Sequence, residues 1–500
     1  MTRKKSLTGL DGPGSVSRIY QEFFRERNEQ IRSFYDKAGE SVEKNWWKRK
    51  YYDGWIADFL ASRVMPNSRI LDLGCGTGHL LASLSPSRGV GIDLSPKMIE
   101  IAKRNHPGLE FHVGDAKDLD EIEGPFDYIL AINLFQEASD IIAILEAAQR
   151  ISEPSTQIVV ITTNDFWRFL YPMLEALGLK QRNLQFNWLD ETEVAIFLRA
   201  TGFEVVWSGR MMPFPFRIPL FSWFINNIFG ILPLFRRTGY VQYCFARPMG
   251  GKGYQGEYSC SVVVPCKDEE DNVLHIVKRI PKMGRWTEII FVDDKSNDRT
   301  REYIKTLILK HPDKRIKLVD GPGKGKGAAC REGFHAAEGD IIMILDADMT
   351  VMPEDLPKFY TALANGYGDF INGSRMVYEL GEQSMRFLNV YGNKFFSKLV
   401  SFILGKPISD TLCGTKVFWR KDLPKYFRAR KLFNNIDKWG DYDLIFGAAL
   451  HNLKIVELPV HYRERVAGQT KMMKRFSNAW IMFKMCWQAL LKFHIHRSLK

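Results

Sequence analysis

Short apolar runs alternate with amphipathic segments along most of the chain. Runs that read as strands, with helical stretches between them, fill the first half in SRILDLG, GVGIDL, LEFHVGDA, FDYILAINL and TQIVVITTN. The alternation begins again at residue 260, in CSVVVPC, EIIFVDD, IKLVDG and DIIMILDAD. Short strands separated by helices are typical of a parallel, doubly wound sheet. The pattern therefore predicts an α/β protein with two tandem domains.

A glycine-rich stretch separates the two halves. PMGGKGYQGEYS contains few apolar residues, and we predict a linker over 249–258. Two domains agree with the length of 500 residues, which exceeds what one hydrophobic core usually supports. We therefore divide the chain into a helical lead-in over 1–45, a first domain over 46–248 and a second domain over 259–500.

Positive charge is concentrated near the C-terminus. The net charge of the chain is +12, and residues 461–500 hold nine Lys or Arg and one acid, Glu464. Four aromatic residues lie among them: Trp480, Phe483, Trp487 and Phe493. A basic, aromatic tail is suited to phosphates and to anionic lipid interfaces, and a solvated amphipathic helix is the alternative. Neither domain shows a motif that reads nucleic acid, so we expect no nucleic-acid partner.

The cysteines and the N-terminus indicate the compartment. The 7 cysteines are scattered without a C-x-x-C pair, which argues against a disulfide scaffold and a structural zinc site and suits a reducing compartment. The basic start MTRKKSLTG has no apolar stretch behind it, so the sequence shows no signal peptide. We expect a cytoplasmic protein, associated peripherally with the cytoplasmic face of a membrane.

One apolar segment has two interpretations. Residues 211–235 are strongly apolar but contain four prolines and a central Asn226-Asn227 pair. A helix that spans a bilayer needs roughly 20 uninterrupted apolar residues. We therefore predict that this segment either docks on a membrane interface or caps a substrate pocket.

The first domain contains a glycine-rich turn. Gly74, Gly76 and Gly78 follow the first strand in ILDLGCGTGHL, and glycine allows a tight turn and close approach of a ligand to backbone amides at a helix N-terminus. The spacing is G-x-G-x-G, not the dinucleotide fingerprint G-x-G-x-x-G. Asp93 ends the next strand, and a further strand ends in Gly114-Asp115-Ala116. Two such acids suit a ligand with ribose hydroxyls and an adenine amine and no pyrophosphate.

These segments resemble the motifs of a known family. LDLGCGTG, GIDLSPKMIEIA, VGDA and FDYILAIN resemble the successive motifs of class I S-adenosylmethionine-dependent methyltransferases, over roughly 40–205. The resemblance implies a Rossmann-like fold in which the glycines line the methionine and ribose of S-adenosylmethionine. Asp93 would hold the ribose hydroxyls, Asp115 would receive the adenine amine, and Asn133 would face the transfer site. The candidate cofactor-binding residues are Asp72, Gly74, Gly76, Gly78, Asp93, Asp115, Ala116 and Asn133. A Rossmann oxidoreductase or an inactive fold is the alternative.

The second domain contains paired carboxylates. ILDADM places Asp346 and Asp348 at the end of an apolar strand, where alternation points both side chains to one face. Mg²⁺ is usually held by one or two carboxylates together with substrate phosphates. A metal at this position would neutralise a departing diphosphate. We therefore predict a Mg²⁺ or Mn²⁺ site at Asp346 and Asp348.

The surrounding motifs resemble a second family. SVVVPCKDEEDNV, FVDDKSNDRT, GPGKGKGAACREGFHAAEGD and ILDADMTVMPEDL resemble glycosyltransferase family 2, which has a GT-A fold, over about 259–470. The resemblance implies a nucleotide-sugar donor, with Asp346 near the ribose-sugar side and Asp348 on the metal. The candidate nucleotide-sugar-binding residues are Pro265, Glu269, Asp294, Lys324 and Gly325. Two positions depart from the family pattern, since Asp268 replaces Asn and Thr350 replaces a frequent Gln.

A finer resemblance concerns the acceptor. NGSRM, SDTLCGTKVFWR, DYDL and ELPVHYRERVAGQTKM, between 372 and 472, resemble polyprenyl-phosphate glycosyltransferases of the dolichyl-phosphate mannosyltransferase group. A phosphate has a second pKa of about 6 and therefore needs cations more than it needs a base. The candidate phosphate-binding residues are Arg375, Arg465 and Lys471. A hydroxyl acceptor would need a general base, with Asp443 as the first candidate and Asp441 as the second.

The sequence thus predicts a bifunctional enzyme. It would transfer a methyl group from S-adenosylmethionine to an acceptor that the sequence does not identify, and a sugar to a polyprenyl phosphate. Sugar transfer to the hydroxyl of a soluble glycan or glycolipid is one alternative. A first domain that only binds S-adenosylmethionine and acts as a scaffold is another.

Overall fold

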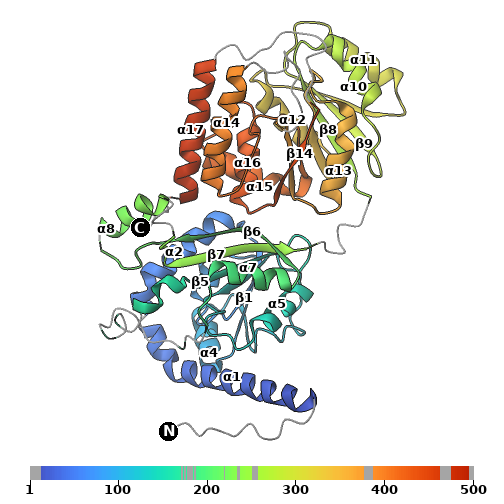
Figure 1. Cartoon of the computed structure of the whole chain (residues 1–500). Helices are drawn as coiled ribbons and strands as arrows, with labels where there is room; N and C mark the ends of the chain where they lie inside the picture. The colour runs from blue at the N-terminus through green and yellow to red at the C-terminus, as the bar shows by residue number, and fades with distance from the viewer. Residues whose placement is uncertain are drawn as a thin grey trace. The chain divides into compact units, whose positions relative to one another are not determined.

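The chain forms two compact α/β units, one within Met1–Met249 and one within Gly250–His496. The computed structural model in Figure 1 describes residues 13–44, 46–170, 173, 176, 184, 187–218, 220–232, 237–249, 257–376, 387–461 and 475–494. Each unit contains its own sheet of seven strands with helices on both faces. The predicted α/β class with two domains is confirmed.

The sheet of the first unit has the strand order β3-β2-β1-β4-β5-β7-β6. Its strands are β1 Arg69–Leu73, β2 Arg88–Asp93, β3 Glu110–Val113, β4 Tyr128–Ile132, β5 Gln157–Thr163, β6 Phe203–Met211 and β7 Val241–Pro248. β1 to β5 are parallel, whereas β7 lies antiparallel between β5 and β6. The sheet is therefore mixed rather than wholly parallel. β6 and β7 follow one another along the chain and pair antiparallel, which needs no crossover connection between them.

Helices cover both faces of this sheet. They are α1 Pro13–Lys44, α2 Trp46–Arg63, α3 His79–Ser83, α4 Pro96–Asn105, α5 Ile141–Arg150, α7 Glu191–Ala200 and α8 Phe221–Asn227, with 3₁₀ turns at Asp165–Leu170 and Phe229–Ile231. Phe59 of α2 packs with Ile70 of β1 on one face, and Leu145 of α5 packs with Leu71 on the other. Local sequence sets where these helices begin, because Ser95 and Asp140 each accept a backbone N–H in the first turn.

The sheet of the second unit has the order β10-β9-β8-β11-β13-β12-β14. Its strands are β8 Cys260–Cys266, β9 Thr287–Asp293, β10 Arg315–Asp320, β11 Ile341–Ile344, β12 Phe370–Ser374, β13 Lys416–Trp419 and β14 Ile455–Pro459. Its helices are α10 Glu270–Arg279, α11 Thr300–Lys310, α12 Lys326–Ala336, α13 Leu356–Ala364, α14 Phe387–Leu404, α15 Leu423–Leu432, α16 Asp441–Leu450 and α17 Arg475–His494, with 3₁₀ turns at Pro353–Asp355 and Arg420–Asp422. β13 is antiparallel to both of its neighbours, so this sheet is also mixed.

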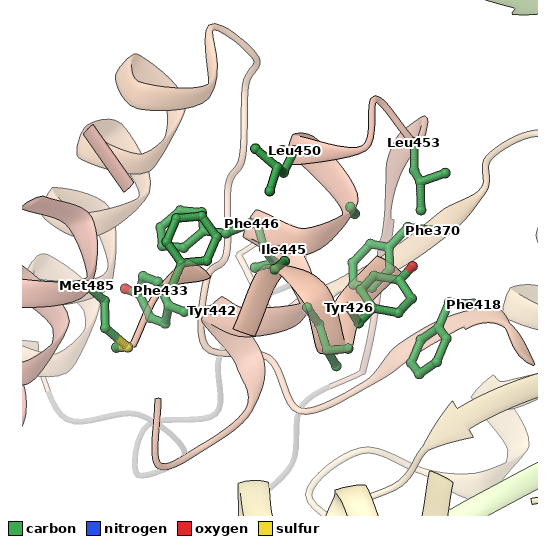
Figure 2. Packing of buried hydrophobic residues seen from close by; sticks show 14 of the residues in the cluster. Phe370, Phe418, Tyr426, Phe433, Tyr442, Ile445, Phe446, Leu450, Leu453 and Met485 are labelled. Carbon is green, nitrogen blue, oxygen red and sulfur yellow. The ribbon is translucent and has the colours of Figure 1, made fainter. Parts of the chain in front are cut away.

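The core of the second unit surrounds α16, whose residues are all buried. Figure 2 shows Phe433, Tyr442 and Phe446 close together, with Met485 of α17 beside them. The rings of Phe433 and Phe446 lie 5.5 Å apart, and so do those of Tyr442 and Phe446. A helix apolar on every side must be enclosed by other elements, as this one is. The core therefore fixes the position of the two carboxylates in its first turn, Asp441 and Asp443.

The C-terminal helix α17 is part of this core. Met482, Met485, Cys486, Ala489 and Phe493 are buried against α14 and α16. The helix is therefore amphipathic, with one side in the core and the other side exposed to solvent. A further set of aromatic and basic side chains remains exposed on the same helix: Trp480, Phe483, Lys484 and Trp487.

The structure also bears on membrane association. Over the part of the chain described above, no helix combines the length and the apolar composition needed to cross a bilayer.

Candidate active sites

The glycine-rich turn of the first unit joins β1 to α3. Gly74, Gly76 and Gly78 have φ angles of 72°, 53° and 76°, a region that favours glycine. A Cβ added to Gly78 would lie 2.7 Å from the ring of Phe111, whereas one added to Gly76 would meet nothing within 4 Å. Gly78 is therefore required for packing, and Gly76 alone of the three faces open space.

Asp93, at the end of β2, holds this turn in place. Its carboxylate accepts hydrogen bonds from the amides of Gly76 and Ser95, each at 2.9 Å. Burial raises the pKa of Asp93, and these two hydrogen bonds oppose the rise. Burial, together with the charge of Asp93, also raises the pKa of Asp72 to about 8. Asp72 is therefore mainly protonated near neutral pH, when it can donate a hydrogen bond.

Asp115 lies beneath a side chain from the N-terminal helix. Asn28 of α1 donates a hydrogen bond of 2.6 Å to its carboxylate, and Ser139 donates to the other end of the same amide at 2.7 Å. The Lys117 ammonium lies 3.4 Å away. Ala116, by contrast, is buried in the core beneath the sheet.

Helix α1 makes further polar contacts with segments that follow the carboxyl ends of the strands. Tyr35 donates to Glu137 at 2.6 Å, Asp36 accepts from Ser95 at 2.6 Å, and Glu43 lies 3.0 Å from His79. The sequence interpretation treated this helix as a lead-in and missed these residues. Their separation of seven residues, Asn28 to Tyr35 and Asp36 to Glu43, would have placed them on one helical face.

Asn133 lies next to aromatic residues of α2. Its φ of 58° is unusual for a residue other than glycine, and its side-chain oxygen accepts a 3.0 Å hydrogen bond from the hydroxyl of Tyr52. The hydroxyl of the preceding residue, Tyr51, accepts a 3.0 Å hydrogen bond from Asn226. The segment over 211–235 is therefore connected through α2 to the residue expected to face methyl transfer.

In the second unit, Asp294 organises the loop that follows β10. Its carboxylate accepts hydrogen bonds from the amides of Gly323 at 2.6 Å and Gly325 at 2.8 Å. These glycines have φ angles of 73° and 94°. The structure thus brings two of the predicted nucleotide-sugar residues, Asp294 and Gly325, into contact. Lys324 lies exposed between the two glycines.

The remaining residues predicted to bind the nucleotide sugar lie at or just after the end of β8. Pro265 is half-buried on that strand, and Glu269 accepts a 2.8 Å hydrogen bond from Asn272. Asp268, which departs from the family pattern, accepts a 2.7 Å hydrogen bond from the amide of Asn297. This carboxylate therefore ties the loop after β8 to the loop after β9.

Lys326 lies in the segment that the resemblance places near the nucleotide, but no role of its own was predicted for it. Its ammonium lies 2.6 Å from Asp346, at the start of α12. Burial would lower the pKa of Lys326, but the charges of Asp346 and Asp441 outweigh it and raise that pKa. A side chain at Gly414 would overlap this ion pair. The sequence signal that could have identified it is the second lysine of GKGKG, which begins helix α12.

Asp346 and Asp348 follow β11 rather than ending it. The strand ends at Ile344, two residues before Asp346. The exposures still alternate, since Leu345, Ala347 and Met349 are buried while both aspartates are partly exposed. Both side chains therefore remain accessible.

The metal prediction can be compared with these contacts. Asp348 accepts a 2.9 Å hydrogen bond from the hydroxyl of Thr350. Within the described ranges, no group of three or more His, Cys, Asp or Glu is placed to hold a metal. A site of one or two carboxylates completed by substrate phosphates does not require such a group. The Asp348 carboxylate is compatible with a Mg²⁺ or Mn²⁺ ion of that kind, whereas Asp346 is paired with Lys326. The metal site stays a prediction.

Arg375 forms a buried ion pair. Its guanidinium donates two hydrogen bonds to Asp410, at 2.7 and 2.8 Å. Burial would raise the pKa of Asp410, but the guanidinium lowers it to about 2. Asn372 donates to the backbone oxygen of Asp410 at 2.8 Å and to Glu457 at 3.0 Å. Three of the four motifs of the finer resemblance therefore meet at this point.

Two further cations were predicted to bind phosphate together with Arg375. Arg465 and Lys471 fall outside the described residues. Their part in phosphate binding stays a prediction.

The two candidate bases are both partnered. Asp441 lies 3.0 Å from the buried ammonium of Lys416, and Asp443 forms an ion pair with Arg430. Burial and the charge of Asp437 raise the pKa of Asp443 to about 7, while Arg430 opposes the rise. Asp443 also lines a cavity with Arg331, Tyr426 and Trp439.

Comparison with known families assigns each unit. Residues 25–207 match the family model described as a methyltransferase domain, and residues 261–427 match glycosyl transferase family 2. Both resemblances read from the sequence are confirmed.

Several relatives are similar to part of the chain. The dolichyl-phosphate hexose transferase of Haloferax volcanii is 29% identical over 42% of this chain and 86% of its own length. The dolichol-phosphate mannosyltransferase of Pyrococcus furiosus is 39% identical over 23% of this chain and 33% of its own length. A dolichyl-phosphate beta-glucosyltransferase of Trichomonas vaginalis is 30% identical, with 42% and 64% covered. The chain thus spans less than two thirds of the latter two relatives.

Solved structures are similar to part of the chain. A Haloferax volcanii methyltransferase in complex with the activator Trm112 is 19% identical, with a TM-score of 0.35, over 44% of this chain and 98% of that one. The magnesium protoporphyrin IX methyltransferase of Synechocystis is 14% identical, with a TM-score of 0.31, over 44% and 99%.

Proposed function

We propose that this chain, in which a methyltransferase domain precedes a family 2 glycosyltransferase domain, is a bifunctional enzyme. The first domain would transfer a methyl group from S-adenosylmethionine to an acceptor that the sequence does not identify, and the second would transfer a sugar from a nucleotide sugar to a polyprenyl phosphate. The names of the relatives support the second acceptor, since those described above act with dolichyl or dolichol phosphate. Sugar transfer would use Mg²⁺ or Mn²⁺ at Asp348 and Asp346.

One observation favours a phosphate acceptor over a hydroxyl. Both carboxylates that could act as a general base, Asp441 and Asp443, are paired with cations. An acceptor that is already ionised needs no base, and arginine can bind it through two parallel hydrogen bonds. Arg375 is the described candidate, although it would share its charge with Asp410. Arg465 and Lys471 are proposed as its partners on the sequence resemblance alone.

Asp443 also supports a second candidate function. Its pKa of about 7 lies where a general base works best near neutral pH, and it lines a cavity. Transfer to the hydroxyl of a soluble glycan or glycolipid therefore stays a competing proposal. Under this alternative, the ion pair with Arg430 would have to open during the reaction.

The methyltransferase site would hold its cofactor around Asp93. The ribose would contact Asp93 and the turn at Gly76, and the adenine would lie near Asp115, where Asn28 could adjust its hydrogen bond. S-adenosylmethionine supplies an electrophilic methyl group when bound, and in-line positioning accounts for much of the acceleration. A domain that binds the cofactor and only acts as a scaffold is the alternative. A methyl-transfer assay decides between them, because the scaffold would bind S-adenosylmethionine without transferring its methyl group. In the methyltransferase, Asp93→Ala should abolish both the binding measured by calorimetry and methyl transfer.

The polyprenyl acceptor implies contact with a membrane surface. Trp480, Phe483 and Trp487 are exposed on α17, and Lys484 lies beside Trp480. Exposed aromatic and basic side chains suit an anionic interface. We propose that the protein associates peripherally with the cytoplasmic face of a membrane through this helix.

The test of this proposal is sugar transfer to a polyprenyl phosphate in the presence of Mn²⁺ or Mg²⁺. Asp348→Ala should lower the rate at least about 100-fold, because the metal stabilises several kcal/mol of developing charge. Binding of S-adenosylmethionine should not change. Asp313→Ala, at an exposed acid in the same unit, serves as the control. Loss of both activities in Asp348→Ala would refute two independent sites.

The same assay separates the two acceptors. Asp443→Asn should retain transfer to polyprenyl phosphate if the acceptor is ionised. If Asp443 is a required base, its loss should reduce the rate by about 100-fold or more. A pH profile of the wild-type rate complements it, since a base with a pKa of about 7 should impose a decline below that value.

A further inference from the structure

The segment between β6 and β7 has its polarity reversed. In α8, Ser222, Asn226 and Asn227 are buried, while Phe221 and Phe224 are exposed. A surface helix of a soluble domain normally turns its apolar side inward. An exposed apolar cluster above buried polar groups is the informative exception.

The buried polar groups hold the segment in this orientation. Asn226 donates to the backbone oxygen of Phe214 and accepts from its amide, both at 2.8 Å. Ser222 accepts from the amide of Ile218 at 2.6 Å and donates to the oxygen of Phe216 at 2.5 Å. Hydrogen bonds of this kind remove the cost of burying the polar side chains. The outward direction of the apolar side chains is therefore built into the fold.

Six exposed apolar side chains give this short segment an apolar surface. We call it the 218–232 surface; it consists of Ile218 (49% exposed), Leu220 (84%), Phe221 (49%), Phe224 (47%), Ile228 (40%) and Leu232 (48%). Ring contacts link it to its support, since Phe214 packs against Phe221 and Phe224 against Phe229. Contiguous exposed apolar side chains mark a contact site far more often than isolated ones.

The charge around this surface identifies its partner. Arg217 and Arg237, on either side of it in the sequence, are exposed. The sequence contains no Asp or Glu from 205 to 256. An apolar segment with basic residues on either side and no acid in the same stretch of chain suits anionic headgroups above acyl chains.

The 218–232 surface is also linked to the methyl-transfer side of the first unit. Asn226 bonds to Tyr51, and the next residue, Tyr52, bonds to Asn133. Figure 1 shows α8 at the periphery of this unit. A partner on this surface would therefore lie near the face through which a methyl acceptor approaches Asn133.

We propose that the 218–232 surface seats the methyltransferase unit on an anionic bilayer and that its methyl acceptor is a molecule resident in that bilayer. The second clause rests on the proposed methyl transfer, and the first does not. The sequence left two interpretations of residues 211–235, membrane docking and a cap over a substrate pocket. This proposal adopts membrane docking.

The test uses a fluorescent label on the full chain. Six of the seven native cysteines are buried and Cys75 is half-buried, with burial raising the pKa of its thiol, so an introduced exposed cysteine should be labelled selectively. Phe224→Cys and, separately, Ile228→Cys carry an environment-sensitive dye. Ile196→Cys is the matched control, because Ile196 is an exposed apolar side chain on another helix, α7, of the same unit.

The dye at 224 or 228 should brighten several-fold with vesicles of phosphatidylcholine and phosphatidylglycerol, and doxyl groups on the acyl chains should quench it. Vesicles of phosphatidylcholine alone should have a smaller effect, and the dye at 196 should not respond. A dye at 224 that is already shielded without lipid and is not quenched would show that protein covers the surface, which overturns the proposal. A dye that stays in water with both vesicles overturns it too.

Two further measurements separate this inference from the proposed function. Phe221→Ser with Phe224→Ser should bind S-adenosylmethionine as the wild type does, and should lose methyl transfer to a lipid extract in vesicles. If the wild type does not bind S-adenosylmethionine, the proposed methyltransferase activity is contradicted, but the proposed contact with lipid is not. Methyl transfer that is equally fast to a water-soluble extract would overturn the assignment of a bilayer-resident acceptor.

Discussion

Single residues in the glycine-rich turn of the first unit have different roles. Gly78 packs directly beneath Phe111, whereas Gly76 faces open space and donates its amide to Asp93. Three glycines that are equivalent in the motif are therefore unequal in the structure. Stability should depend mainly on one, and cofactor affinity on the other.

Substitution by alanine should separate the two glycines. Gly78→Ala should reduce the free energy of unfolding by about 2–4 kcal/mol, since left-handed strain and overpacking add. Gly76→Ala should cost only about 1–2 kcal/mol of strain but weaken binding of S-adenosylmethionine. Urea unfolding and calorimetry measure these quantities. Equal losses of stability in the two variants would contradict the assignment.

Asp72 should make stability depend on pH. Its pKa is about 8 in the folded chain against about 3.9 when unfolded, so between these values the folded state binds the extra proton. The free energy of unfolding should therefore fall as pH rises through this window. Asp72→Asn cannot ionise and should lose less stability than the wild type between about pH 5 and pH 8. Parallel pH profiles of unfolding would exclude this role.

Among the helices, α1 is the element whose role changes most. Seen in sequence it is a polar helix before the first strand, yet Asn28, Tyr35, Asp36 and Glu43 contact loops at the carboxyl ends of the strands. Its stability should depend on these contacts, because long helices are held mainly by what they pack against.

Loss of two of these contacts should loosen α1. Asn28→Ala with Tyr35→Phe should speed hydrogen exchange of the α1 amides about 10-fold, which corresponds to about 1.4 kcal/mol. The midpoint of global unfolding should change little. Gln30→Ala, at an exposed position of the same helix, should leave exchange unaltered. Unchanged exchange in the double variant would show that the hydrogen bonds of Asn28 and Tyr35 do not hold α1.

At the scale of the whole molecule, the two units should bind their ligands independently. S-adenosylmethionine should slow hydrogen exchange in the turn at 74–78 and at the end of β2. A nucleotide sugar with Mn²⁺ should slow it in the loop at 321–327 and in the turn after β11. Each ligand stabilises only the state that binds it, so protection should stay within one unit. Protection of the second unit by S-adenosylmethionine would indicate coupling between the sites.

The sequence by itself determined the class of fold and the two families. Strand-length apolar runs and ordered motifs are local features, and β1, β2, β8 and β9 lie where those runs predicted them. It did not predict the direction of strands that join the sheet from distant parts of the chain, as in the antiparallel β7 and β13. The antiparallel pairing of these strands is set by distant parts of the chain, which no local period records.

Tertiary structure decided the partners of the charged residues. The motifs contain Arg375, Asp443 and Asp346, but their pairing with Asp410, Arg430 and Lys326 joins segments that the sequence does not connect. It also decided which side of residues 218–232 faces outward, because Ser222 and Asn226 find hydrogen-bond partners only in the folded chain. Composition indicates that a segment is apolar; only the hydrogen bonds beneath it determine whether those side chains are buried or presented to a membrane.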